Sequence, residues 1–528
     1  MPTTHWGQTM SKSIALAAAL LWASAASAAD LTMALSSSPT SMDPQFHNLG
    51  ANANVAANIF EPLVAMDGDS RIGPGLAVSW RAVDDLTWEF KLRPGAKFSD
   101  GTKFTADDVV YSLNRPPSLV NSPAGYVIFT RAIIGKTVVD AETVLLTTAT
   151  PYPLLISDLS AIFMLSRKAS DGVPTEAFAT GKGVLGTGPY KFVSFARDEK
   201  VQVTRSATYD GKPAPWDNAT LRFIPNNAAR LASLLSGDVD GIEGVPTPDL
   251  DTVKANPKLV FGQKISGRLI YLFVDSGRDD TPFVTAKDGK KLAKNPLSDV
   301  RVRRALSMAI NREAISSRVM AGLGYPTNNL VPDTLFGNDP TLKIPPNDPD
   351  AAKKLLAEAG YPDGFALTVH APNNRFVNDD KIAQAVAQMF SRIGITAAVD
   401  TMPMASYAAR GAKSDFSIGL IGYGAQTGES SSTLRAIIAC AKPETGGGLF
   451  NWSHFCDPAV DALVGKALTT VDDPARLDLL RRAAHLAVDE GAIIPLHFQA
   501  TTWAARKGIT IVPRTDERTF AGTFLPGG

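Results

Sequence analysis

Residues 77–115 read AVSWRAVDDLTWEFKLRPGAKFSDGTKFTADDVVYSLNR, a stretch that combines the signals of a strand, two turns and a helix. Apolar and charged side chains alternate in WEFKL (88–92), which is typical of a half-buried strand. Turns are indicated at 93–95 and 100–101 by proline and glycine. The sequence TADD at 105–108 has the spacing of a capping box and predicts a helix start. This stretch therefore predicts a mixed α/β protein.

The same mixture of signals continues toward the C-terminal end. Three helices are predicted to start where aspartate precedes proline, at residues 348–349, 457–458 and 473–474. Each start is followed by apolar residues three and four positions apart, the stripe of a helix that packs on a core. The short apolar strand predicted at 493–498 follows the third helix directly, as expected for an α/β unit.

Length and composition bound the class of protein. The chain has 528 residues, of which 45% are hydrophobic and 20% charged, and its formal net charge is 0. This length corresponds to about three domains at ~150 residues each. No basic stripe interleaved with aromatic residues is present, so no nucleic-acid partner is expected. The numbers predict a large globular protein with sizeable cores.

An export signal is predicted near the N-terminal end. Residues 10–30 read MSKSIALAAALLWASAASAAD, where a lysine precedes an unbroken apolar run and a small-residue cleavage site at 26–28. This order is typical of a secretory signal peptide, which covers residues 1–28 and starts at Met1 or Met10. A buried N-terminal helix is the alternative. No cysteine stands directly after the cleavage site, where a lipid would be attached, so we expect an exported, soluble protein without a lipid anchor.

The two cysteines, Cys440 and Cys456, lie 16 positions apart around three glycines at 446–448. In an oxidising compartment this spacing favours one disulfide bond across a loop. Two free buried thiols, or a metal site that includes His454, remain alternatives.

The search for catalytic motifs finds none. The G-x-S-x-G, S-x-x-K and H-E-x-x-H motifs and Walker-type phosphate loops are absent from the sequence. Residues 422–428 come near a dinucleotide fingerprint but do not match its spacing. The six histidines are dispersed and do not pair at metal-ligand spacing. We therefore expect a protein that is not an enzyme and that uses no cofactor and no metal.

Several segments together resemble the extracellular solute-binding proteins of family 5, the peptide/nickel-binding group of ABC transporters. The resemblance begins with 77–115 and continues, in the family's order, through the rest of the chain. The further segments are GTGPYKFVSF (186–195), SGDVDG (236–241), DVRVRRALSMAINREAI (299–315), AAKKLLAEAGYPDGF (351–365) and VDALVGKAL (460–468).

The resemblance implies a bilobal periplasmic binding protein of the α/β class, type II-like and with an extra inserted domain, whose two mixed-sheet lobes close on a ligand about a hinge. The chain is expected to cross between the lobes near 267–268 and 494–495. The implied boundaries are lobe 1 (domain I) at 30–65, 186–268 and 494–528, the inserted domain II at 66–185, and lobe 2 (domain III) at 269–493.

The implied function is that of the periplasmic substrate-binding component of an ABC importer. Such a protein captures a solute and delivers it to the permease complex in the inner membrane, and we expect it to be a monomer. The resemblance also favours the disulfide between Cys440 and Cys456, because the dipeptide-binding branch has a similar loop. A periplasmic hydrolase acting on peptides or glycans is the alternative function, and an additional role as a sensor partner stays open.

The ligand loop departs from the family's pattern. Peptide-binding members commonly carry Trp-x-x-Asp, in which the acid holds the peptide α-ammonium group. The corresponding stretch here is 422–426, where Tyr423 can supply an aromatic wall and Gln426 replaces the acid. Glu429 could substitute for that acid, although we expect it to face solvent or to start a helix. The ordinary ammonium anchor is therefore predicted to be absent.

Further ligand-contacting residues follow from the same resemblance. Some relatives hold a ligand carboxylate with an arginine in the place of Arg375, which lies next to Asn374. Met404 stands where relatives often have tryptophan and would form a softer wall. A surface role for Arg375 and a core role for Met404 are the alternatives. Segments that usually border the cleft add the residues Tyr271, Leu49 and Asn52.

These departures predict the class of ligand. An arginine without a matching acid favours a solute that carries a carboxylate or another anion and has no free α-ammonium group. Modified peptides, opine-like conjugates and small organic acids meet this description. Nickel is disfavoured because the expected loop contains no histidine.

Overall fold

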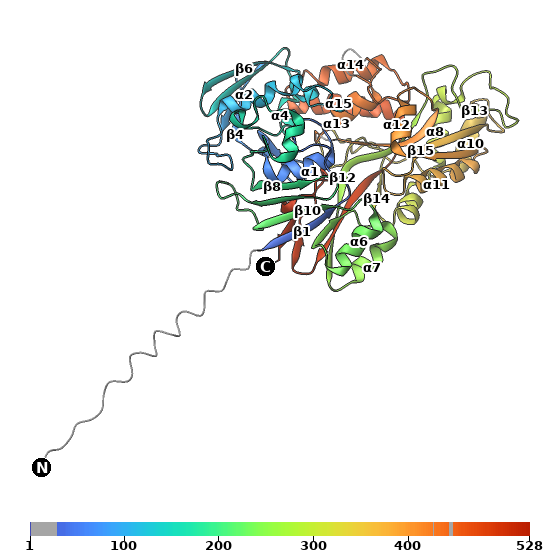
Figure 1. The fold of residues 1–528 in the computed structure, drawn as a ribbon. Helices are drawn as coiled ribbons and strands as arrows, with labels where there is room; N and C mark the ends of the chain where they lie inside the picture. The colour runs from blue at the N-terminus through green and yellow to red at the C-terminus, as the bar shows by residue number, and fades with distance from the viewer. Residues whose placement is uncertain (2–28, 426, 443–446, 528) are drawn as a thin grey trace.

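The computed structural model describes residues 1, 29–425, 427–442 and 447–527 (Figure 1). The predicted signal peptide, apart from its first residue, and Gln426 lie outside the described residues. No helix in the described part of the chain has the length and apolar character needed to cross a membrane.

The largest element is a mixed sheet, in which the described residues form twelve strands. Strand β14 (Gly324–Pro326) pairs with β18, and β16 (Thr396–Met402) pairs with β15. The order of the other strands is β13 (Val284–Thr285), β15 (Ala366–Pro372), β17 (Ile418–Gly424), β12 (Leu259–Val274), β18 (Ile493–Arg506), β11 (Gly241–Glu243), β1 (Asp30–Leu35), β10 (Asn218–Phe223), β9 (Lys200–Arg205) and β8 (Tyr190–Ala196).

Two long antiparallel strands, β12 and β18, join the two halves of this sheet. Their pairing runs from Leu259 opposite Arg506 to Phe273 opposite Ile493, with irregularities between Ile265 and Leu269 and between Ile270 and Tyr271. The strand predicted at 493–498 is thus the first part of a strand of 14 residues. The backbone hydrogen bonds continue from one half to the other.

A second sheet contains the stretch that predicts the fold. Its strands are β4 (Ala77–Ala82), β5 (Thr87–Leu92), β7 (Thr143–Thr148) and β6 (Ile133–Asp140), in that order. As the alternation predicts, Phe90 and Leu92 are buried and Lys91 is exposed. Helix α2 (Ala106–Asn114) follows and begins with the predicted capping box, in which the backbone N–H of Thr105 donates to Asp108 Oδ2 at 3.0 Å.

The predicted Asp-Pro helix starts are α10 (Pro349–Glu358), α14 (Pro458–Ala467) and α15 (Asp473–Asp489). Asp348 and Asp457 cap the first two as predicted, accepting backbone N–H groups at 2.9 and 2.8 Å. The prediction for α15 is wrong by one residue, because Asp472 is the cap and accepts from the N–H of Ala475 at 2.9 Å. Two consecutive aspartates precede this proline, and only the first has the extended backbone of a cap.

The remaining helices and short strands lie at the surfaces and ends of these sheets. They are α1 (Gly50–Ile59), α3 (Val127–Thr130), α4 (Leu155–Leu159), α5 (Arg167–Ser170), α6 (Asn227–Ser236), α7 (Leu250–Ala255), α8 (Val300–Ala309), α9 (Arg312–Ala314), α11 (Asp379–Ser391), α12 (Met404–Gly411), α13 (Ser430–Thr433), the π-helix η6 (Leu434–Ile438), and the strands β2 (Val64–Met66), β3 (Ile72–Pro74), β19 (Ile509–Ile511) and β20 (Phe524–Pro526).

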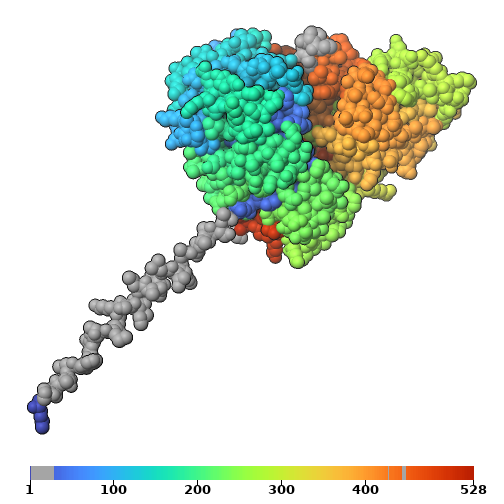
Figure 2. All heavy atoms as spheres, viewed as in Figure 1, coloured from blue at the N-terminus to red at the C-terminus, as the bar shows by residue number. Residues whose placement is uncertain are grey.

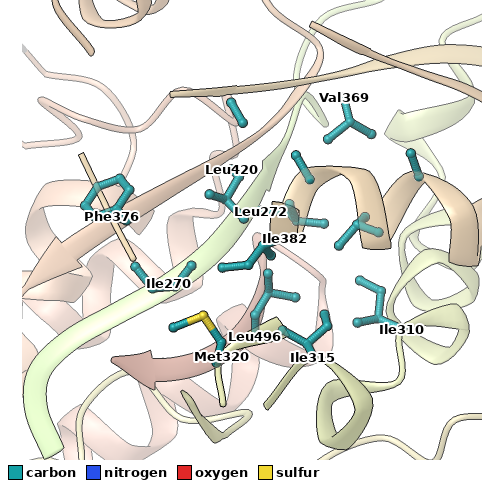
Figure 3. Packing of buried hydrophobic residues seen from close by; sticks show 14 of the residues in the cluster. Ile270, Leu272, Ile310, Ile315, Met320, Val369, Phe376, Ile382, Leu420 and Leu496 are labelled. Atoms are coloured by element: carbon teal, nitrogen blue, oxygen red, sulfur yellow. The ribbon is translucent and has the colours of Figure 1, made fainter. Parts of the chain in front are cut away.

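Several separate hydrophobic cores hold the fold together. One of them packs Ile270 and Leu272 of β12 and Leu420 of β17 against Ile382 of α11 (Figure 3). A different core lies on the other face of β12 and contains Leu269, Tyr271 and Phe273. A third core is built from residues between 63 and 164 and supports the second sheet. Burial of apolar surface in these cores is the main stabilising contribution, at about 25 cal/mol per Å².

Candidate ligand-binding cleft

A furrow separates two bodies of the molecule in Figure 2, one blue to green and the other mainly orange. The loop that follows β17 approaches the first body at Gly428. A Cβ atom on Gly428 would lie 3.1 Å from the carbonyl oxygen of Ser70, and the backbone φ of +73° also favours glycine. The end of β17 and its loop therefore lie where the two bodies meet.

Tyr423 lies on β17, one residue before the strand ends, and is half-buried. Its ring centroid is 6.4 Å from that of Phe450, and burial raises the pKa of its hydroxyl to about 12. Tyr271, on the neighbouring strand β12, is only 2% exposed. Burial, and then the proximity of Tyr423, raises the pKa of Tyr271. The structure thus brings these two predicted residues together, with Tyr271 in the core behind Tyr423.

Arg375 lies in the loop between β15 and α11. Its backbone N–H donates to Asp379 Oδ2 at 3.0 Å, which fixes the loop, and its guanidinium lies 5.3 Å from the centre of the Phe376 ring. The side chain is exposed, but within the described chain its guanidinium makes no hydrogen bond or ion pair. Surrounding protein, and then the like charge of Arg268, lowers its pKa. The group is a cation that protein surrounds and that still has access to solvent.

The nearby acid, Glu517, is not available to Arg375. It forms a bidentate ion pair with Arg268, with Nε–Oε1 and Nη2–Oε2 distances of 3.0 and 2.6 Å. Arg268, rather than burial, lowers the pKa of Glu517. Because this pair is internally neutral, and Asp379 accepts backbone N–H groups, neither acid forms an ion pair with the Arg375 guanidinium among the described residues.

Asn374 and Met404 are also brought together. Asn374 Oδ1 accepts a hydrogen bond from the backbone N–H of Met404 at 2.8 Å, which ties the β15–α11 loop to the start of α12. Met404 is half-buried and packs partly against the core that contains Tyr407. Asn374 therefore positions the loop that carries Arg375.

Leu49 directly precedes α1, and Asn52 lies on that helix. Leu49 is exposed. Asn52 is buried, and its amide holds the preceding loop by accepting from the N–H of Thr40 at 3.1 Å and donating to the carbonyl oxygen of Ser41 at 3.3 Å. Among the described residues, neither has a recorded contact with Tyr423 or Arg375.

Of the two alternatives expected for Glu429, the structure confirms the start of a helix, because Glu429 is the N-cap of α13, and not the solvent-facing position. Its side chain is buried, with 6% of the residue exposed, and forms an ion pair with Arg476 of α15. The hydroxyl of Ser431 also donates to it. These partners occupy the carboxylate, so Glu429 is not available to replace the missing acid of the ligand loop.

Sequence reasoning missed a polar cluster across the furrow. The hydroxyl of Tyr152 donates to Asp158 Oδ2 at 2.6 Å, and Asp158, on α4, is 4% exposed. Burial raises the pKa of Asp158 to about 7, against the opposing effects of Tyr152 and Arg435. Arg435 lies on η6, so this cluster joins segments that are far apart in the sequence. No local pattern around any of the three residues indicates it.

The predicted disulfide between Cys440 and Cys456 is confirmed. The two sulfur atoms are bonded to each other, which excludes the alternatives of free thiols and of a metal site. The bond closes the loop that carries Phe450 and therefore supports the aromatic neighbour of Tyr423.

A mixed α/β fold in which two long strands join the halves of the main sheet, with a furrow between two bodies of the molecule, is typical of the class of bilobal solute-binding proteins. The chain belongs to the bacterial extracellular solute-binding proteins of family 5, whose middle-region sequence model matches residues 71–444. The resemblance noted in the sequence is thereby confirmed.

Individual relatives agree with this assignment. The glutathione-binding protein GsiB of Escherichia coli (strain K12) is 30% identical over 518 residues, which cover 95% of this chain and 96% of that protein. The solved structure of MoaA from A. tumefaciens R10, in complex with mannopinic acid, has 25% identity and a TM-score of 0.73, covering 95% of this chain and 100% of MoaA. DppA from Helicobacter pylori, in complex with the peptide STSA, shares the fold with 22% identity, a TM-score of 0.75, and coverage of 94% and 98%.

These relatives are solute-binding proteins of ABC transporters, and this chain is accordingly a solute-binding protein of the same kind. None of the three is described as a hydrolase, so the comparisons lend no support to the alternative function.

Proposed function

We propose that this protein is the periplasmic substrate-binding component of an ABC importer and that it captures a peptide-like or opine-like anionic solute. It acts as a monomer without catalysis and delivers the solute to a permease complex in the inner membrane. Residues 1–28 direct export and are removed. The observation that carries the ligand class is the guanidinium of Arg375, which lies over the Phe376 ring beside the end of β17 and has no ionic partner among the described residues.

The electrostatics of the cleft support an anion. The two acids near Arg375 have partners in the chain, since Glu517 pairs with Arg268 and Asp379 accepts the backbone N–H groups of Arg375 and Phe376. A guanidinium in partly desolvated surroundings is stabilised by a bidentate carboxylate, and a ligand can supply one. GsiB is named for glutathione and MoaA binds mannopinic acid, and both compounds are carboxylates at neutral pH.

Capture is proposed to occur by closure of the two lobes, with the boundaries 30–65, 186–268 and 494–528 for lobe 1, 66–185 for the inserted domain and 269–493 for lobe 2. The irregular pairing of β12 with β18 between Ile265 and Leu269 supplies a place for the hinge. The hydroxyl of Ser266 donates there to the carbonyl oxygen of Gln499 at 2.7 Å.

Calorimetric titration of the purified mature protein tests the ligand class. We expect mannopinic acid to bind most tightly. Glutathione, which has two carboxylates but also a free α-ammonium group, should bind more weakly, and an unmodified dipeptide such as Met-Leu, with one carboxylate and a free α-ammonium group, should bind most weakly or not at all. Arg375→Gln should weaken binding of the anion about 10- to 100-fold, the range expected from losing a hydrogen bond to a charged group.

Arg392→Gln is the matched control, because Arg392 is an exposed arginine at the C-terminal end of α11, the helix that follows the Arg375 loop. Preferred binding of the dipeptide, or equal losses in both variants, would contradict the role of Arg375. Chemical turnover of a bound compound would contradict the proposal of a binding protein.

A further inference from the structure

Arg435 carries a second guanidinium that has no hydrogen-bond or ionic partner among the described residues. The π-helix η6 buries Leu434, Ile437 and Ile438 in the core, while Arg435 is only half-buried. Within the residues that the structure describes, its guanidinium donates no hydrogen bond and forms no ion pair. A partly desolvated guanidinium with five donor N–H groups and no acceptor is unfavourable unless a partner arrives.

Arg435 has neighbours on both sides of the furrow. Its positive charge acts on Tyr423, which lies on β17 in lobe 2, and lowers the pKa of that hydroxyl against the effect of burial. The same charge acts on Tyr152 and Asp158, which belong to the inserted domain. Arg435 is therefore near enough to act on both groups, and the core that holds its helix, through Leu434, Ile437 and Ile438, is also the one against which Tyr423 packs.

Arg375 and Arg435 flank the end of β17 from opposite faces of the sheet. Successive residues of a strand point to opposite faces. A Cβ atom on Gly422 would lie 2.8 Å from the ring of Phe376, over which Arg375 lies, so this face of the strand leads to Arg375. Tyr423 points to the other face, where Arg435 lies.

We propose that Arg435 binds a second anionic group of the captured solute, so that the ligand carries two carboxylates, one at Arg375 and the other at Arg435. This inference rests on the proposed function and specifies its substrate class. In this proposal the solute lies across the end of β17 between the two guanidinium groups, and Tyr423 contacts its middle part. A ligand with a single carboxylate leaves one arginine without a partner.

Asp158 is the other acceptor that Arg435 could pair with when the lobes close. The observations favour the ligand, because Oδ2 of Asp158 already accepts from Tyr152 and its burial opposes ionisation. The negative charge of Glu429 opposes it further. A neutral carboxyl group does not satisfy a guanidinium as a carboxylate does.

Glutathione and its two monoamides test the assignment, because each amide removes the charge of one carboxylate and keeps the shape. Calorimetric titration is made with the wild-type protein and with Arg435→Gln, Arg435→Lys and Arg375→Gln. We expect the wild type to bind the diacid about 10- to 100-fold more tightly than either amide.

Arg435→Gln should remove the difference in affinity between the diacid and one of the two amides. Arg375→Gln should remove the difference between the diacid and the other amide. Arg435→Lys should retain part of the preference, because it keeps the charge and loses the bidentate geometry. Mannopinic acid serves as a second probe, and thermal unfolding checks that each variant is folded.

If Arg435→Gln keeps the wild-type preference against both amides, the assignment is wrong. If Arg435→Gln weakens the binding of all three compounds equally, and its effect is not additive with that of Asp158→Asn, then Arg435 pairs with Asp158 between the lobes instead of binding the ligand. If the wild type binds neither glutathione nor mannopinic acid, the proposed ligand class itself fails and takes the assignment with it.

Discussion

Arg476 and Arg435 lie on two helical elements that pack against each other, but only Arg476 has a carboxylate partner. Arg476 of α15 is 3% exposed and pairs with Glu429, whereas Arg435 of η6 is half-buried and unpaired among the described residues. Elsewhere the scaffold follows the first pattern, as in Arg115 with Asp43 at 2.5 Å. The difference separates arginines that hold the fold from arginines that are available to a ligand.

Removal of the paired acid should have the largest effect on stability. Glu429→Ala leaves the guanidinium of Arg476 buried without a counter-charge, so we expect the free energy of unfolding to fall by about 3–5 kcal/mol. Urea unfolding followed by circular dichroism measures it. The double variant Glu429→Leu with Arg476→Met should recover most of the loss, because no charge remains buried.

Asp473→Asn is the control for this experiment. Asp473 also approaches Arg476, at 3.9 Å, but its side chain is 75% exposed. Solvent screens such a contact, so little change in stability is expected. A loss for Asp473→Asn as large as that for Glu429→Ala would remove the distinction between buried and exposed pairs.

Replacing Asp158 should have an intermediate effect on the free energy of unfolding, and the size of that effect should depend on pH. Its pKa is raised to about 7 in the folded protein, and an unfolded aspartate titrates near 3.8. Between these values the folded state holds a proton that the unfolded state has lost, so raising the pH favours unfolding. The contribution of Asp158 to stability is fully present below about pH 4 and falls by up to about 1.4 kcal/mol per pH unit as the pH rises toward 7.

Urea unfolding of the wild type and of Asp158→Asn at several values between pH 5 and pH 8 isolates this contribution. The groups that face Asp158 are Tyr152, Arg435, Glu429 and Arg131, and all remain in the variant. The difference in unfolding free energy between wild type and variant should therefore fall as the pH rises toward 7. A difference that stays constant, or rises, would show that Asp158 is ionised throughout the range.

Local signals in the sequence predict the parts of the fold that local interactions decide. The alternation at 88–92 and the capping box at Thr105 depend only on neighbouring residues, and both are found in the structure. The family resemblance adds the architecture. Arg375 and Tyr423 were predicted through that resemblance, and the structure places both beside the end of β17.

The rest of the site depends on contacts between distant segments. Glu429 meets Arg476 because α15 packs beside the ligand loop, and the residues around Glu429 do not record that approach. The charge of Arg435 acts on Asp158 only because two bodies of the fold face each other. A single arginine within TLRAIIA looks like any surface residue, so its lack of a partner becomes visible only in three dimensions.

The unpaired arginines should give the smallest change in the stability of the free protein. Arg375→Gln and Arg435→Gln remove no hydrogen bond or ion pair to the described residues, so we expect changes within about 0.5 kcal/mol, as for Arg392→Gln. Ligand should reveal the difference, since a solute at 100 times its dissociation constant stabilises the wild type by about 2.7 kcal/mol. Both cleft variants should lose most of that gain in thermal unfolding with mannopinic acid, whereas Arg392→Gln should keep it. A loss of about 2 kcal/mol or more without ligand would instead place Arg435 with the paired arginines that hold the scaffold.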